Sequence, residues 1–135
     1  MKPALIAIVM ILAAQTLGAA EPQHSVATLP AVVVKTEPQA GLKNVDPNTS
    51  EIKVTFSKKM LNKSWSWGQI SDETAVQGTG QPHYLKDGKT CVLPVALKPN
   101  TQYRLGLNSP SFKNFRSAKG VPLVPVAYTF KTSGP

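Results

Sequence analysis

The stretch from Leu97 to Leu107 constrains the fold of this chain more than any other segment. The turn-forming residues Pro99 and Asn100 come first, and alternating aromatic and aliphatic residues follow them. A tyrosine near the start of such a strand can fold its ring against the corner of a β-sandwich and bond its hydroxyl to upstream backbone. The sequence predicts this structural role for Tyr103.

Short alternating segments separated by turn residues predict an all-β domain. In Glu51–Phe56 the apolar residues fall on one face and the polar residues on the other, which is typical of a half-buried strand. Asp87-Gly88 suits a tight hairpin turn between two further strands. We expect an immunoglobulin-like β-sandwich of about seven antiparallel strands. The expected strands are 32–35, 51–56, 64–68, 82–85, 90–95, one that ends near 107, and 128–132.

Alternate residues of these strands define the predicted core. Cys91 is the only cysteine, so the chain forms no internal disulfide, and we expect its thiol to be buried as a small hydrophobic group. The other predicted core residues are Val33, Ile52, Val54, Phe56, Leu93, Val95, Tyr103, Leu105, Leu107, Tyr128 and Phe130.

The first 20 residues have the pattern of a cleaved signal peptide. Lys2 precedes an apolar run from Ala4 to Ala14, and Gly18-Ala19-Ala20 offers small residues for cleavage. The run is shorter than the roughly 20 residues of a membrane-spanning helix, so we expect no membrane span. The expected organisation is a signal peptide over 1–20, a flexible segment over 21–30, the domain over 31–132 and a tail over 133–135. We expect an exported protein, periplasmic or secreted.

The charge of the chain favours anionic partners. The formal net charge is +8, and it falls to +7 when Lys2 leaves with the signal peptide. An excess of cations attracts wall polymers, lipid headgroups or nucleic acid, and export makes nucleic acid the least expected of these.

Three segments carry a resemblance to a known family. They are Glu37-Pro38-Gln39-Ala40-Gly41, Asn44-Val45-Asp46-Pro47, and the run from Ile52 to Met60. Together with the later strands they resemble bacterial Ig-like domains of the S-layer type (SbsA Ig-like, or bacterial Ig-like domain 5) over about residues 31–132. One departure is Lys59, where the family often has proline. The resemblance implies an exported module for binding, adhesion or assembly at the cell envelope, with an envelope protein or a polysaccharide surface as partner, no active site and no cofactor.

The residues themselves also give no sign of catalysis. The seven carboxylates are scattered along the chain, and no histidine lies beside a serine or cysteine in a nucleophile and base motif. We expect no catalytic residues. A copper carrier is one alternative, because such exported proteins resemble this chain in having an Ig-like barrel and a Pro-x-x-Gly opening, and they bind copper through an N-terminal histidine. His24 and His83 would be the ligands, although the usual His-rich or Met-rich pattern is missing.

Two surface candidates remain for a binding site. Trp65 and Trp67 are two residues apart, so a regular strand places both indoles on one side, where they form either a platform for sugar rings or part of the core. The long segment between Ser109 and Pro125 combines aromatic residues with cations, which suits an anionic glycan or an acidic protein surface, or else packs on itself. Its candidate binding residues are Phe112, Lys113, Phe115, Arg116 and Lys119.

Overall fold

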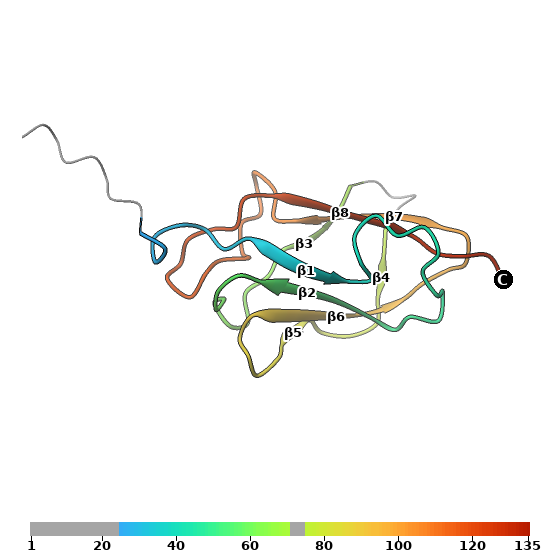
Figure 1. The fold of residues 1–135 in the computed structure, drawn as a ribbon, viewed down its shortest axis with the longest axis horizontal. Coiled ribbons are helices and arrows are strands. Elements are labelled where there is room, and N and C mark those ends of the chain that lie inside the picture. Colours follow the sequence, from blue (N-terminus) through green and yellow to red (C-terminus); the bar gives the residue numbers. More distant parts are fainter. Residues whose placement is uncertain (1–24, 71–74) are drawn as a thin grey trace, which may run out of the picture.

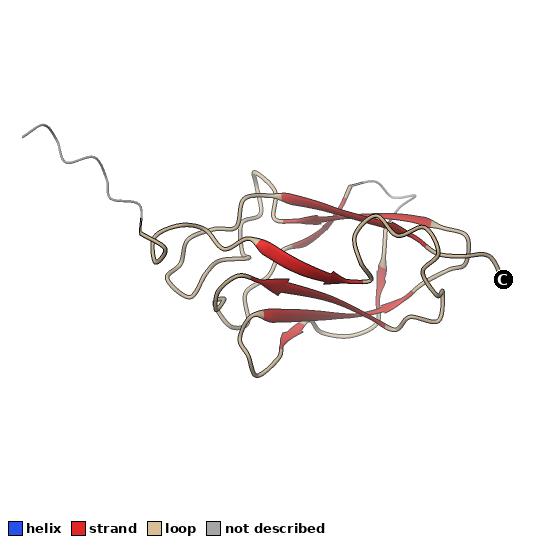
Figure 2. Cartoon of the chain, viewed as in Figure 1, coloured by secondary structure: helices blue, strands red, loops and turns tan. Residues whose placement is uncertain are grey.

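Eight short strands form two antiparallel sheets in the computed structural model, which describes residues 25–70 and 75–135 (Figure 1). Within these residues the structure contains strands and loops and no helix (Figure 2). The two sheets pack face to face as a β-sandwich. The first sheet contains β1 (Val33–Glu37), β2 (Glu51–Phe56), β6 (Thr90–Ala96), β4 (Gln77–Gly78) and β5 (His83–Tyr84), and the second contains β3 (Trp67–Gln69), β7 (Gln102–Leu107) and β8 (Val126–Lys131).

The predicted all-β sandwich is confirmed, and the strand bounds differ where the side-chain pattern is weak. The strand over Glu51–Phe56 is found as predicted, because its alternation follows directly from one buried and one exposed face. The strand predicted over 64–68 is shorter and later, and covers Trp67–Gln69. The segment over 72–80, predicted as a loop, contains β4, which pairs with Ala96 and Val95 through its backbone.

The chain changes sheets directly after β1. Gly41, at a positive φ of 86°, donates its N–H to Thr129 of β8 at 2.7 Å, and Val45 donates to Lys131 at 3.0 Å. The segment that follows β1 in the first sheet therefore lies along β8 of the second. This connection links the two layers with backbone hydrogen bonds in addition to core packing.

The core lies between the sheets and contains all predicted core residues except Val33, which is half-buried. The register of β1 against β2 shifts between Val33 and Lys35, and such a bulge turns the strand away from its regular inward and outward alternation. Loop residues complete the core. They are Ala31, Val45, Met60, Phe115 and Leu123, of which Phe115 is completely buried.

Tyr103 makes the contact that defines a tyrosine corner. Its hydroxyl accepts a hydrogen bond from the backbone N–H of Lys98, five residues upstream, at 2.7 Å. Its ring lies 5.4 Å from that of Phe130, which lies 5.4 Å from that of Tyr128. The corner therefore joins the turn before β7 to an aromatic cluster in the second sheet.

The predicted leader and its cleavage site fall outside the described residues, and the proposed boundaries of the domain stay predictions. Over 25–70 and 75–135, the structure contains no helix that is long and apolar enough to cross a membrane.

The buried thiol of Cys91 gives a test of the core. Its side chain has no exposed surface, and burial raises the pKa of the thiol to about 12. Only the thiolate attacks a disulfide reagent, so we expect native Cys91 to resist Ellman's reagent and to react with one equivalent after unfolding in urea. Rapid reaction of the folded protein would contradict the packing of β6 described above.

Candidate functional site

A groove surrounds Trp65 beside β3, the edge strand of the second sheet. Two cavities, of about 760 Å³ and about 370 Å³, share Trp65 and Pro82 in their walls. We call them together the Trp65 groove. The larger cavity is also lined by Ser66, Trp67, Gly68, Gln69, Ile70, Gly106, Asn108, Ser109, Phe112 and Asn114, and the smaller by Asn62, Lys63, Gln81, His83 and Tyr84.

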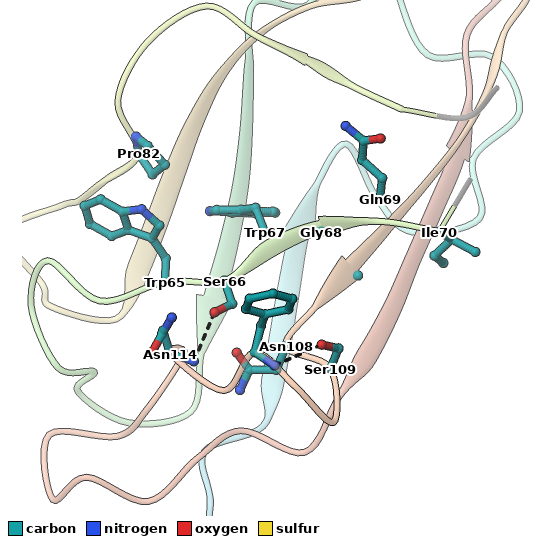
Figure 3. Close-up of a pocket in the computed structure, with 12 residues that line it drawn as sticks. Trp65, Ser66, Trp67, Gly68, Gln69, Ile70, Pro82, Asn108, Ser109 and Asn114 are labelled. Atoms are coloured by element: carbon teal, nitrogen blue, oxygen red, sulfur yellow. Dashed lines mark hydrogen bonds between the residues drawn. The ribbon is translucent and has the colours of Figure 1, made fainter. Parts of the chain in front are cut away.

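Side chains from both faces of β3 line the larger cavity. Figure 3 shows Trp65 and Trp67 on one side of β3, and Ser66 with Asn114 on the other. This separation follows from the alternation of side chains along extended backbone. In the middle of the strand, Gly68 lies opposite Gly106 of β7, so no side chain fills the floor at this point.

The two indoles are both half-buried and pack against the core, which is intermediate between the exposed platform and the core position that the sequence left open. Trp67 packs edge-on against Phe115 at 5.4 Å between ring centroids. Trp65 lies 6.3 Å from the ring of Tyr84, whose hydroxyl donates to the carbonyl of Ser64 at 3.1 Å. Trp67 therefore supports the core, and Trp65 is the indole at the centre of the groove.

Asn108 holds the long loop after β7 in place, and the sequence analysis missed this role. Its side-chain amide donates to the carbonyls of Phe115 at 2.9 Å and Leu123 at 3.0 Å, and its carbonyl oxygen accepts from the N–H of Phe115 at 2.9 Å. Asn108 is buried and has a positive φ of 63°, which asparagine tolerates better than most residues. We call this set of contacts the Asn108 clamp.

With the loop held by the clamp, some of its predicted binding residues are buried and others are exposed. Phe115 lies in the core, where it contacts Phe56 and Trp67, so it supports the loop and cannot form a binding surface. Phe112 is 67% exposed and lines the groove. Lys113 and Lys119 are exposed, and Arg116 is half-buried with its guanidinium donating to the carbonyl of Gly120 at 3.1 Å.

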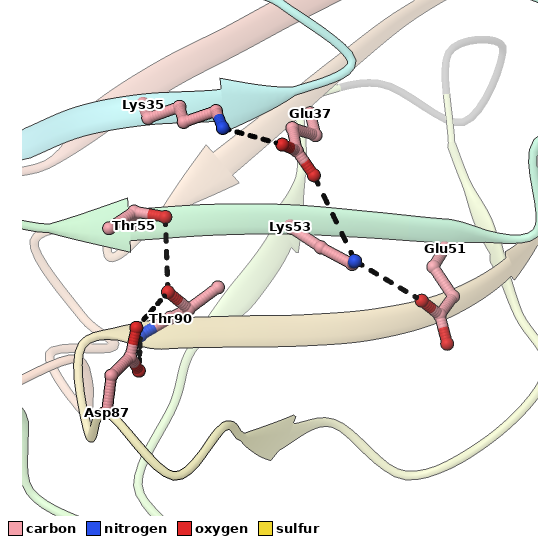
Figure 4. Close-up of polar contacts among 7 residues, drawn as sticks. All are labelled: Lys35, Glu37, Glu51, Lys53, Thr55, Asp87 and Thr90. Atoms are coloured by element: carbon pink, nitrogen blue, oxygen red, sulfur yellow. Dashed lines mark hydrogen bonds and ion pairs between the residues drawn. The ribbon is translucent and has the colours of Figure 1, made fainter.

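The described carboxylates have structural partners. Lys35 forms an ion pair with Glu37 at 2.8 Å, and its hydrogen bond and charge lower the pKa of Glu37 (Figure 4). Asp87 accepts hydrogen bonds from the backbone of Lys89 and from Thr90, which lower its pKa and fix the turn before β6. These contacts give each carboxylate a structural role: Glu37 pairs with a lysine of its own strand, and Asp87 stabilises its turn.

Only one of the two histidines of the copper alternative lies among the described residues. His83 is exposed on β5, and His24 lies outside the described residues. Within residues 25–70 and 75–135, no group of three or more histidine, cysteine or acidic side chains lies close enough to hold a metal ion.

The fold and these contacts agree with the comparisons with known proteins. A family model described as a bacterial Ig-like domain matches residues 27–132. The chain belongs to this family. The resemblance found in the sequence is thereby confirmed, and the tyrosine corner and the sheet change after β1 are features of this bacterial Ig-like domain. No curated protein matches the chain.

Solved surface-layer proteins contain the same fold. Domains 1–6 of the surface layer protein SbsC match 81% of this chain with a TM-score of 0.52 and 17% sequence identity. The S-layer protein rSbsC(31-844) matches the same share with a TM-score of 0.51 and 17% identity. This bacterial Ig-like domain covers 14% of the length of each, and at this identity the likeness concerns the fold.

Two phenylalanines of the clamped loop provide a matched test of its packing. Phe115→Ala removes a completely buried ring and is expected to lower the free energy of unfolding by about 3–5 kcal/mol. Phe112→Ala removes a largely exposed ring and is expected to change it by less than about 0.5 kcal/mol. Urea unfolding with an unchanged slope measures both, and equal effects would contradict the assignment of Phe115 to the core.

Proposed function

We propose that this bacterial Ig-like domain is a non-catalytic binding module of the cell envelope that holds a glycan in the Trp65 groove. The single observation that carries the proposal is the position of Trp65, which forms a wall of both cavities. An indole between two adjoining cavities can stack on one sugar ring in one cavity, and the next ring of the chain can lie in the other cavity beside the edge of the indole.

The chemistry of the groove suits sugars. An aromatic face packs against the C–H face of a sugar ring, and amide and hydroxyl groups exchange hydrogen bonds with its hydroxyls. Gln69 and Asn114 are exposed and supply amides, and Ser66 and Ser109 supply hydroxyls. The larger cavity is within the range of about 300–1,000 Å³ that is usual for ligand sites.

The fold supports a location at the cell envelope. The solved proteins that share it are described as surface-layer proteins, and the first 20 residues have the pattern of an export signal. We propose that the domain is exported and works in the periplasm or outside the cell. The site is on a groove and loops of a rigid sandwich, which is the usual arrangement of binding modules on this architecture.

Assembly with another protein by strand addition is the second candidate, and the free edges give it less support. Among the described residues β3 pairs only with β7, but it is three residues long, and β1 carries a bulge and the exposed Lys35. Short edges, bulges and lysines are the devices that keep edge strands from pairing with another chain. The groove therefore favours a glycan over an added strand.

Tryptophan fluorescence tests the proposal. We expect oligomers of N-acetylglucosamine or solubilised wall glycan to change the emission of the protein on titration, and Trp65→Ala to weaken binding by at least about 10-fold. Phe112→Ala leaves the core intact and is expected to weaken binding by a smaller factor.

Val34→Ala is the matched control, because Val34 is exposed on β1 and does not line the groove. Calorimetry with the same sugars checks the affinities without a fluorescent reporter. Failure of both glycans to bind, or equal binding by the Trp65 variant with its fold intact by circular dichroism, would refute the proposal.

A further inference from the structure

Four loops from distant parts of the chain meet at one end of the sandwich. Met60 bridges to Ser117, and Leu61 donates its N–H to the carbonyl of Arg116 at 2.8 Å. Met60 also donates to the carbonyl of Gly88 at 2.9 Å, and the ammonium of Lys58 donates to the carbonyl of Leu29 at 2.7 Å. Loops 57–63, 86–89 and 108–125 and the segment 25–32 therefore form one surface, opposite the C-terminal end in Figure 1.

Eight of the fourteen lysines and arginines among the described residues lie on this surface, which we call the cationic end. Two of them have structural tasks, since Lys58 binds carbonyls of the segment 25–32 and Arg116 binds its own loop. The other six are exposed, and the only acid on these loops is Asp87, which is held by its turn. These six are Lys59, Lys63, Lys86, Lys89, Lys113 and Lys119.

The other described acids lie away from this end. Glu37 and Glu51 pair with Lys35 and Lys53 in the strands β1 and β2, as Figure 4 shows, and Asp46 lies in the turn between those strands. All three ion pairs of the described residues belong to this group. Among the residues that the structure describes, no lysine of the cationic end forms an ion pair, and Asp87 is the one acid near them.

Exposed apolar side chains lie among these lysines. Leu61 in the loop 57–63 is 42% exposed, and Leu85, directly before the loop 86–89, is 41% exposed. Phe112 is 67% exposed beside Lys113. The segment 25–32 adds Val26 and Leu29, exposed by 79% and 43%. Exposed apolar side chains among unpaired cations indicate an interaction surface rather than a face that contacts only water.

We propose that the cationic end binds the surface of an anionic lipid bilayer. Lysines at such a surface are attracted by the lipid phosphates, and apolar side chains beside them enter the boundary between headgroups and acyl chains. The exposed lysines supply the charge, and Leu61 and Leu85 supply the apolar contact. This binding is peripheral, and neither leucine lines the glycan groove. The two surfaces adjoin at Lys63 and Phe112, which line the groove as well.

A soluble polyanion is the competing partner, and the leucines distinguish the two. A wall polymer rich in phosphate attracts the lysines equally well, but it offers no apolar phase for Leu61 and Leu85. The apolar residues on the same loops favour the bilayer.

Sedimentation with vesicles tests the proposal on the protein purified after export. We expect it to bind vesicles of phosphatidylcholine and phosphatidylglycerol in equal parts, to bind vesicles of pure phosphatidylcholine far less, and to lose binding at high salt. The combined variant Lys59→Ala, Lys86→Ala and Lys119→Ala is expected to bind about 100-fold more weakly, since each lysine near an anionic surface contributes about fivefold. The matched control removes the same charge from the opposite end with Lys43→Ala, Lys98→Ala and Lys131→Ala and is expected to bind nearly as well as the parent.

A second variant separates the bilayer from a polyanion. Leu61→Ser with Leu85→Ser keeps every charge and is expected to weaken vesicle binding by about 10-fold. Absence of vesicle binding, equal binding to neutral vesicles, or equal losses in the two lysine variants would overturn the proposal. Unchanged binding by the leucine variant together with full competition by soluble polyphosphate would overturn it in favour of a polyanion site. None of these outcomes affects the glycan test, which uses Trp65.

Discussion

The Asn108 clamp is the interaction on which both proposed surfaces depend. The loop between Ser109 and Pro125 has no strands of its own, so holding it in one conformation costs a large amount of conformational entropy. The buried amide of Asn108 binds the backbone at Phe115 and Leu123, and the ring of Phe115 anchors the same point in the core. The residues between these fixed points are thereby placed: Phe112 and Asn114 line the groove, and Lys113 lies beside them.

The two proposed surfaces of the domain would bind their partners through different kinds of interaction. The groove offers aromatic faces and neutral hydrogen-bonding groups at the open side of β3, which suits a short-range, directional ligand. The cationic end offers long-range attraction over several loops, which suits an extended charged surface. Because the acids that pair with lysines lie along β1 and β2, the charge of the domain is uneven from end to end. The leucines of the cationic end do not line the groove, so the apolar contact with a bilayer and the stacking of a glycan on Trp65 use different residues.

Residue patterns predicted the parts of the fold in which periodicity reflects burial. The strand Glu51–Phe56, the buried Cys91 and the hydroxyl contact of Tyr103 follow from local sequence. The half-burial of Val33 and the strand β4 do not, because a bulge and backbone pairing by Gln77 and Gly78 leave no side-chain pattern. The position of Trp65 depends on β3 being the edge of its sheet, and the Asn108 clamp joins residues that have no periodic relation. The one local signal for the clamp was an asparagine directly after the last core residue of β7, ahead of a long loop.

Hydrogen exchange in Asn108→Ala tests most directly whether the clamp orders the loop. Loss of its three hydrogen bonds leaves buried backbone groups unpaired, at a cost of about 2 kcal/mol or more. We expect the amides of residues 109–123 to exchange at least about 10-fold faster, while β2 and β6 keep their protection. The matched control is Asn100→Ala, an exposed asparagine with a similar positive φ of 56°, which reports the backbone effect alone. Unchanged exchange of the loop in the Asn108 variant would contradict the account.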